Sequence, residues 1–135
     1  MNINMKDIIS RLEVLLKTPS PTGNTEKVNA YVRELFEEIQ VPVRFTEKGA
    51  LIATIEGRDT NRSVTLSGHV DTLGAMVKEL KSNGRLKISQ LGGYVMDTVE
   101  GEHVVVEAMD GRTYTGTLVR KFDSCILQNP FKSFK

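Results

Sequence analysis

The residues most suited to chemistry are a histidine and an aspartate two positions apart, His69 and Asp71. They follow the apolar, β-rich run Ser63–Ser67, which is expected to be a buried strand, and Gly68, which frees the backbone. Such groups gather at the carboxyl ends of strands in open α/β sheets. Residues two apart on an extended segment face the same side, so the imidazole could bind a metal ion while the carboxylate fixes the ring.

The spacing alone leaves a structural alternative open. A His-x-Asp pattern is short and arises often by chance. A zinc site needs three or four protein ligands, and His69 is one. From these residues alone, a pair without a metal role is favoured.

The flanking sequence is more specific. The segment from Ser67 to Lys78 combines a strand end, Gly-His-x-Asp, a glycine and a hydrophobic strand. It resembles the first metal-ligand motif of the glutamyl aminopeptidase family, which includes the tetrahedral and deblocking aminopeptidases. The resemblance extends to other short segments: Pro19–Gly23, Lys48–Ala53, Ser82–Ile88, Leu91–Gly93, Gly101–Val106, Asp110–Gly111 and Tyr114–Leu118. One departure is Thr72, where many members carry an acidic residue, so a role for that carboxylate does not transfer.

The resemblance implies a metal-dependent aminopeptidase that removes N-terminal residues from peptides with a water activated by two divalent metal ions, zinc or cobalt. It implies His69 as a metal ligand and Asp71 as the catalytic residue that orients the imidazole and raises its basicity. The family's other ligands and its general base lie beyond the end of this chain. We therefore expect at most one partial metal site here, an inactive chain when alone, and homo-oligomers among full-length relatives.

Two other classes of function remain open. A related two-zinc metallocarboxypeptidase or deacylase is one, because His-x-Asp-Thr occurs there too. A non-catalytic fragment is the other. The segment Gly74–Lys78 and the β-rich sequence after it favour the aminopeptidase.

Composition limits the partners and the compartment. The chain has 135 residues, enough for one core or two small ones, with 26% charged residues and a net charge of +1. This balance gives no reason to expect nucleic acid or a membrane surface as a partner. No apolar run approaches membrane-spanning length, and the first residues lack the core of a signal peptide. Cys125 is the only cysteine, which favours a cytoplasmic location, and nothing near it in sequence would activate it as a nucleophile.

The first part of the chain, residues 1–76, is predicted to be the N-terminal part of an α/β metallopeptidase catalytic domain, with two helices on a mixed sheet. Apolar residues at helical spacing predict a helix over Met5–Lys17, which the loop Thr18–Gly23 terminates. A second amphipathic helix follows a cap at Asn24 or Thr25. The strands Val41–Thr46 and Leu51–Ile55 form a hairpin before the buried strand.

The second part changes character after Gly74. Short strands separated by glycine turns predict only β structure, as part of an inserted small β-barrel domain over residues 77–119. His103 lies in a valine-rich strand and is interpreted as a strand residue, without a metal role. Residues 120–135 resemble nothing in the family, and we expect an atypical tail that reflects truncation or a frameshift.

Overall fold

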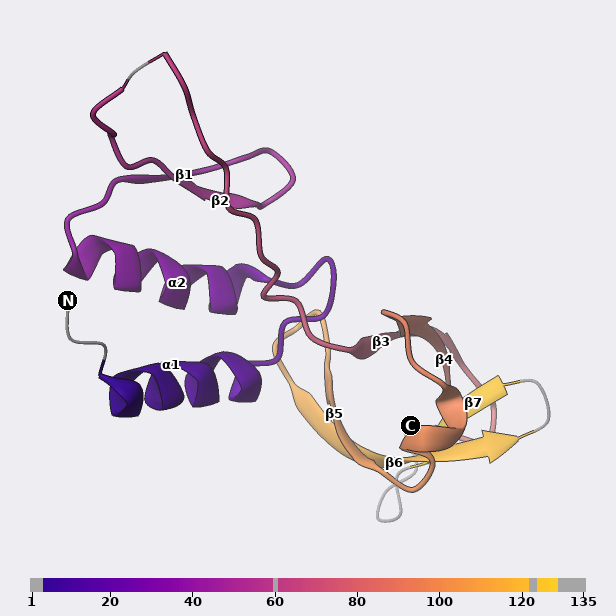
Figure 1. The fold of residues 1–135 in the computed structure, drawn as a ribbon. Helices are drawn as coiled ribbons and strands as arrows, with labels where there is room; N and C mark the ends of the chain where they lie inside the picture. Colours follow the sequence, from indigo (N-terminus) through magenta and orange to yellow (C-terminus); the bar gives the residue numbers. More distant parts are fainter. Residues whose placement is uncertain (1–3, 60, 122–123, 129–135) are drawn as a thin grey trace. The chain divides into compact units, whose positions relative to one another are not determined.

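The structure is a computed structural model that describes residues 4–59, 61–121 and 124–128. It divides the chain into two compact units, Met1–Thr72 and Leu73–Lys135. The two units are described separately below, beginning with the helices and hairpin of the first (Figure 1).

Helix α1, Met5–Lys17, has the bounds predicted from its periodicity. The Asn4 side chain accepts the Lys6 N–H at 3.1 Å and caps the first turn. The Thr18 hydroxyl donates to the Val14 carbonyl at 2.7 Å and closes the last turn. None of the helix's residues is buried, so its apolar stripe is left open to solvent.

Helix α2, Glu26–Glu38, follows the predicted cap at Thr25, whose side chain makes no capping bond. Its buried residues are Val28, which is fully buried, and Asn29. The Asn29 amide donates to the Thr25 hydroxyl at 3.2 Å and to the Gly49 carbonyl at 2.9 Å, which ties the helix to the hairpin turn.

The predicted hairpin is confirmed. Strand β1, Val43–Phe45, pairs antiparallel with β2, Leu51–Ala53, and α2 packs against both. The turn places Gly49 at a φ of 81°, a conformation that favours glycine. A hydrogen bond of 2.8 Å from the Thr46 N–H to the Ala50 carbonyl closes it.

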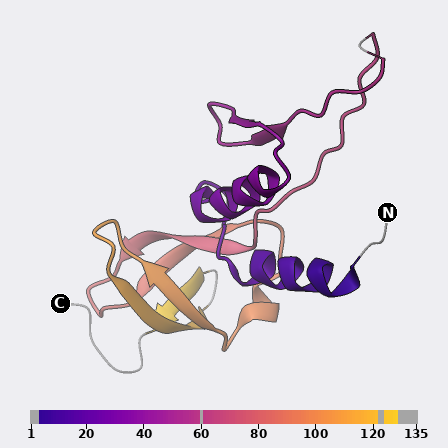
Figure 2. The same ribbon diagram turned by 90° about the vertical axis from the view of Figure 1, so that its left-hand side faces the viewer.

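The buried strand predicted at Ser63–Ser67 is wrong for this structure. Within the described residues the segment pairs with no other strand, and Val64 and Leu66 are 89% and 94% exposed. A strand needs hydrogen-bonded neighbours, and propensity alone does not supply them. Figure 2 shows this part of the chain as an extended path without a neighbouring strand, on the arm of the loop that leads toward β3. The expected mixed sheet is thus reduced to the hairpin and one isolated parallel bridge, Pro21 with Thr72.

The second unit is a curved five-stranded antiparallel sheet (Figures 1 and 2). Its strands stand in the order β3-β4-β7-β6-β5. Their bounds are β3 Gly74–Leu80, β4 Leu86–Leu91, β5 His103–Glu107, β6 Thr113–Lys121 and β7 Ser124–Gln128. Leu86 and Leu118 form its buried core, with four partly buried residues packed against them: Ile88, Val99, Val104 and Val106.

One turn of 3-10 helix, Met96–Val99, corrects the prediction of only β structure. Both the amide and the hydroxyl of Thr98 donate to the Val95 carbonyl, at 3.0 and 2.6 Å, so a local side chain closes the turn. The turn brings Val99 onto the core of the sheet.

The segment 120–135, expected to be atypical, lies partly outside the described residues. Its described strand, β7, pairs antiparallel with β4 on one side and β6 on the other. The Cys125 side chain lies outside what the structure describes. In the described residues, no helix is long and apolar enough to cross a bilayer.

Candidate functional site

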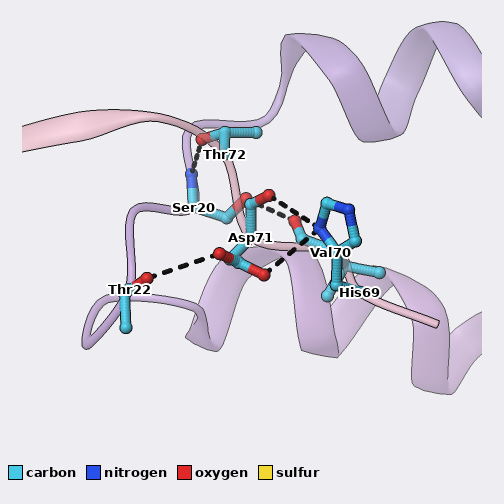
Figure 3. Close-up of polar contacts among 6 residues, drawn as sticks. All are labelled: Ser20, Thr22, His69, Val70, Asp71 and Thr72. Atoms are coloured by element: carbon cyan, nitrogen blue, oxygen red, sulfur yellow. Dashed lines mark hydrogen bonds and ion pairs between the residues drawn. The ribbon is translucent and has the colours of Figure 1, made fainter. Parts of the chain in front are cut away.

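His69 and Asp71 lie together as predicted. The imidazole Nδ1 is 3.3 Å from an Asp71 carboxylate oxygen and also 3.3 Å from the Asp71 carbonyl oxygen. The His69 side chain is 85% exposed and the Asp71 side chain 45% exposed. Figure 3 shows Nδ1 turned toward Asp71 and the second ring nitrogen pointing away from it.

This arrangement selects one form of the neutral imidazole. Two acceptor oxygens face Nδ1, so the contacts assign the proton to that nitrogen. Nε2 then carries the lone pair and faces away from Asp71. A metal-binding histidine commonly has this arrangement, with its other ring nitrogen donating to a carboxylate or carbonyl.

The loop after α1 holds the backbone of this segment. The Ser20 hydroxyl donates to the Val70 carbonyl at 2.7 Å, and the Thr72 N–H donates to the Ser20 carbonyl at 3.0 Å. The Ser20 N–H donates to the Thr72 hydroxyl at 3.1 Å. The Thr22 hydroxyl reaches the second carboxylate oxygen of Asp71 at 3.4 Å. The carboxylate therefore lies between His69 and the loop (Figure 3).

Thr72 has a structural role in this arrangement. Its hydroxyl accepts the Ser20 N–H, and its own N–H donates to the Ser20 carbonyl. The hydroxyl of Thr72 is therefore bonded to the loop that follows α1.

The described residues do not form a complete metal site. They contain no group of three or more His, Cys, Asp or Glu side chains that could hold an ion together. The imidazole of His69 fits one ligand position, and a stable zinc site needs about four. His103, as predicted, is an exposed residue of β5, with Nδ1 3.2 Å from the Thr117 hydroxyl.

Ser20, which holds the backbone around Asp71, is the residue of this segment that sequence reasoning missed. The resemblance places its loop near the active-site side, but a helix terminator is sufficient to explain every residue in the loop, because prolines flank Ser20 on both sides. No periodicity signals that a polar side chain there is fully buried. The available signal for Ser20 was that Pro19–Gly23 is one of the segments that resemble the family.

A separate pocket lies between α2 and the turn of the hairpin. Neither His69 nor Asp71 lines it. The buried polar residue at its wall, Asn29, has both of the hydrogen bonds described above, and no buried side-chain nitrogen or oxygen in the described residues is unpaired. The pocket therefore shows no group that awaits a ligand.

Comparison with known proteins places this site in a family. The family model for M42 glutamyl aminopeptidase matches residues 49–126, which include His69 and Asp71 and extend into the segment expected to be atypical. YhfE of Bacillus subtilis (strain 168), a provisionally named aminopeptidase, is 46% identical over 116 residues. That alignment covers 86% of this chain and 34% of YhfE.

Solved structures agree in fold. A TET aminopeptidase from the marine sediment archaeon Thaumarchaeota archaeon SCGC AB-539-E09 has a TM-score of 0.83 at 21% identity, over 97% of this chain and 40% of that one. The Pyrococcus horikoshii TET1 peptidase, described as able to assemble into a tetrahedron or a large octahedral shell, has a TM-score of 0.70 at 18% identity, over 95% of this chain and 38% of that one. These similarities confirm the predicted fold class, a partial α/β domain.

The chain spans about a third of the length of the curated relative and about two fifths of each of these structures. The family model nevertheless matches more than half of the chain itself, over the segment that carries the His69–Asp71 pair. The chain therefore belongs to the M42 glutamyl aminopeptidase family.

Proposed function

We propose that this chain contributes one metal ligand to the active site of a metal-dependent aminopeptidase. The observation that carries the proposal is the geometry of His69, whose Nδ1 faces two oxygens of Asp71 while Nε2 points away. The pair lies inside the segment that matches the M42 family model. Use of divalent metal ions follows from the family, and zinc or cobalt as the metal is part of the proposal.

Each residue of the pair has a distinct role in this proposal. His69 offers the Nε2 lone pair to the ion, and Asp71 accepts the hydrogen bond of Nδ1–H, which fixes the tautomer and the orientation of the ring. A bound divalent ion supplies Lewis acidity toward a peptide carbonyl and lowers the pKa of a bound water. We place Asp71 as a residue that acts through His69.

The remaining parts of the site are assigned elsewhere. The described residues hold no cluster that could complete the coordination sphere. We propose that the other ligands, the second ion and the general base belong to the part of an M42 catalytic domain that this chain does not span.

The same resemblance carries three further proposals. Residues 1–76 belong to the catalytic domain and residues 77–119 to a β domain inserted in it. Peptides are the substrates, and the complete assembly is a cytoplasmic homo-oligomer. Of the hydrolase classes left open, the M42 match supports the aminopeptidase over the carboxypeptidase or deacylase.

The test compares the 135-residue chain with a chimera in which its matched 116-residue stretch replaces the aligned stretch of YhfE. Both are assayed with amino-acid p-nitroanilides in saturating zinc or cobalt, with YhfE as the positive control. We expect metal-dependent turnover from the chimera and none from the chain alone, because one imidazole does not make a stable site.

Two histidine variants of the chimera make the test specific. His69→Ala should abolish turnover, whereas His103→Ala, which removes an exposed imidazole bonded to Thr117, should leave it unchanged. Full activity in the His69→Ala chimera would refute the proposed ligand. Turnover by the chain alone that disappears in its own His69→Ala variant would show instead that the chain is a complete enzyme.

A further inference from the structure

We infer that Ser20 is a positioning residue for the His69–Asp71 pair, an inference whose catalytic meaning rests on the proposed function. Ser20 is fully buried, although it lies in a surface loop between two prolines. A buried hydroxyl is costly unless it is hydrogen-bonded, and the partners of Ser20 all lie in the segment that carries the pair.

The hydrogen bonds of Ser20 fix both peptide units that flank Asp71. The unit between Val70 and Asp71 is held through its carbonyl, which accepts the Ser20 hydroxyl at 2.7 Å. The unit between Asp71 and Thr72 is held through its N–H, which donates to the Ser20 carbonyl at 3.0 Å. With both planes held, the backbone torsions of Asp71 have little freedom.

The second of these bonds also aims the Asp71 carbonyl. In a trans peptide the N–H and the C=O of one unit point in opposite directions, and the chain has no cis peptide bond among its described residues. Directing the Thr72 N–H at the loop therefore directs the Asp71 carbonyl away from the loop. That oxygen is the one found 3.3 Å from His69 Nδ1.

The consequence is a link from a buried serine to the protonation form of an exposed imidazole. Ser20 touches neither ring nitrogen, and it acts by presenting an acceptor to Nδ1. With the acceptor in place the Nδ1–H tautomer is stabilised and Nε2 keeps its lone pair. Without the carbonyl, the Asp71 carboxylate oxygen is the remaining acceptor at Nδ1, and the preference for the Nδ1–H tautomer weakens.

The test measures the His69 tautomer in the intact 135-residue chain by ¹⁵N NMR of the imidazole. In the parent chain we expect mostly the Nδ1–H form. Ser20→Ala should shift the ring toward the Nε2–H form and should speed exchange of the Thr72 amide by at least about fivefold, because a buried carbonyl loses its donor and the segment opens more often.

The matched control is Thr18→Ala. The Thr18 hydroxyl also donates to a backbone carbonyl at 2.7 Å, but that carbonyl belongs to Val14 in α1. This variant should leave the His69 tautomer and the Thr72 amide unchanged. Ser20→Cys, which keeps a weaker donor of similar size, should shift the tautomer in the same direction as Ser20→Ala and by less.

A further variant tests the inference if the Ser20→Ala chain does not fold. If Ser20→Ala loses its helical circular dichroism, Thr72→Val removes only the hydroxyl that accepts the Ser20 N–H, and it should shift the tautomer partway. A parent chain without the Nδ1–H form, or folded Ser20 and Thr72 variants with an unchanged tautomer, would overturn the inference.

Zinc titration of the same samples separates this inference from the proposed function. In one outcome, the tautomer depends on Ser20 but the Nε2 signal of His69 does not change with zinc. This outcome would support the positioning role of Ser20 and count against His69 as a metal ligand. In the other outcome, the Nε2 signal changes with zinc but the tautomer is the same in the Ser20 variants. This outcome would support His69 as a metal ligand and overturn the positioning role of Ser20.

Discussion

Asp71 contacts His69 through two different oxygens, and substitution can separate them. Asp71→Asn removes the charge of the carboxylate, whereas the backbone carbonyl stays. In the chimera with YhfE, Asp71→Asn should lower zinc affinity or turnover by ~10–100-fold, the usual effect of losing a carboxylate behind a ligating histidine. Competition with a chromophoric chelator measures the affinity. Asp110→Asn, a change at an exposed turn, is the control, and equal affinity in both variants would contradict the assigned role.

A second carboxylate has a measurable property of its own. Asp110 pairs with Arg112 at 2.5 Å and accepts its backbone N–H at 3.1 Å, and these bonds hold the pKa of Asp110 below its ordinary value of 3.8. The ion pair stabilises the turn fully at pH values above the ordinary pKa of Asp110. This stabilisation is lost as the pH falls through the lowered pKa. Arg112→Gln should raise the pKa of Asp110 toward 3.8.

The side-chain ¹³C shift of Asp110, followed through an acid titration, measures this change. Arg112→Lys keeps the charge but loses the planar guanidinium, so it should raise the pKa by less. An Asp110 midpoint that is the same in all three chains would show that the ion pair does not form in solution.

The core of the sheet gives a prediction about the strands β3 and β4. Leu86 is 6% exposed in the core, and its cross-strand neighbour Leu80 is 57% exposed. Leu86→Ala should lower the free energy of unfolding of the sheet by about 2–4 kcal/mol, because it removes buried methyl groups and leaves a cavity. Leu80→Ala deletes the same atoms from a solvated site and should cost less than about 1 kcal/mol.

Urea denaturation, followed by a probe in the sheet such as amide exchange of β5 and β6, distinguishes the two variants. Equal destabilisation by both substitutions would mean that the Leu86–Leu118 contact is not the core of this unit.

The elements that the sequence predicted are those whose signals are local. Helix α1 follows from apolar spacing, and the β1–β2 hairpin follows from two short runs around a glycine turn. Ser63–Ser67 has an equally strong β-strand propensity. A strand also depends on hydrogen-bonded neighbouring strands, which the residues of this run do not specify. The 3-10 turn at Met96–Val99 depends on one threonine hydroxyl, a signal too short for periodicity.

The residues of the candidate site also separate into those with a local sequence signal and those without one. His69 and Asp71 could be found because alternation on an extended segment places them together. Ser20 could not be found from any local pattern of residue types, because its partners are about fifty positions away in sequence. The atypical composition of residues 120–135 likewise gave no sign that β7 pairs with two strands.

At the scale of the whole chain, exposed apolar residues predict self-association. Val64 and Leu66 are almost fully exposed on an unpaired β-rich segment, and such segments template pairing between molecules. Sedimentation velocity of the 135-residue chain should show a sedimentation coefficient that rises with concentration. The double variant Val64→Lys/Leu66→Lys should reduce that dependence.

The matched control adds the same two charges to the alternate positions, Ser63→Lys/Thr65→Lys, and leaves the apolar side chains in place. It should reduce the association by less, because it adds repulsion without removing apolar surface. A parent chain that sediments as a monomer at every concentration would refute the prediction.

The order of the five strands has a consequence for synthesis of the chain. Strands β3 and β4 emerge first from the ribosome as one hairpin, and β5 and β6 follow as another, yet β7 lies between β4 and β6. A two-stranded hairpin is only marginally stable by itself. Until β7 has emerged as well, the edges of β4 and β6 that it will join therefore stay unpaired, and the strand that joins them is the last of the five to be made.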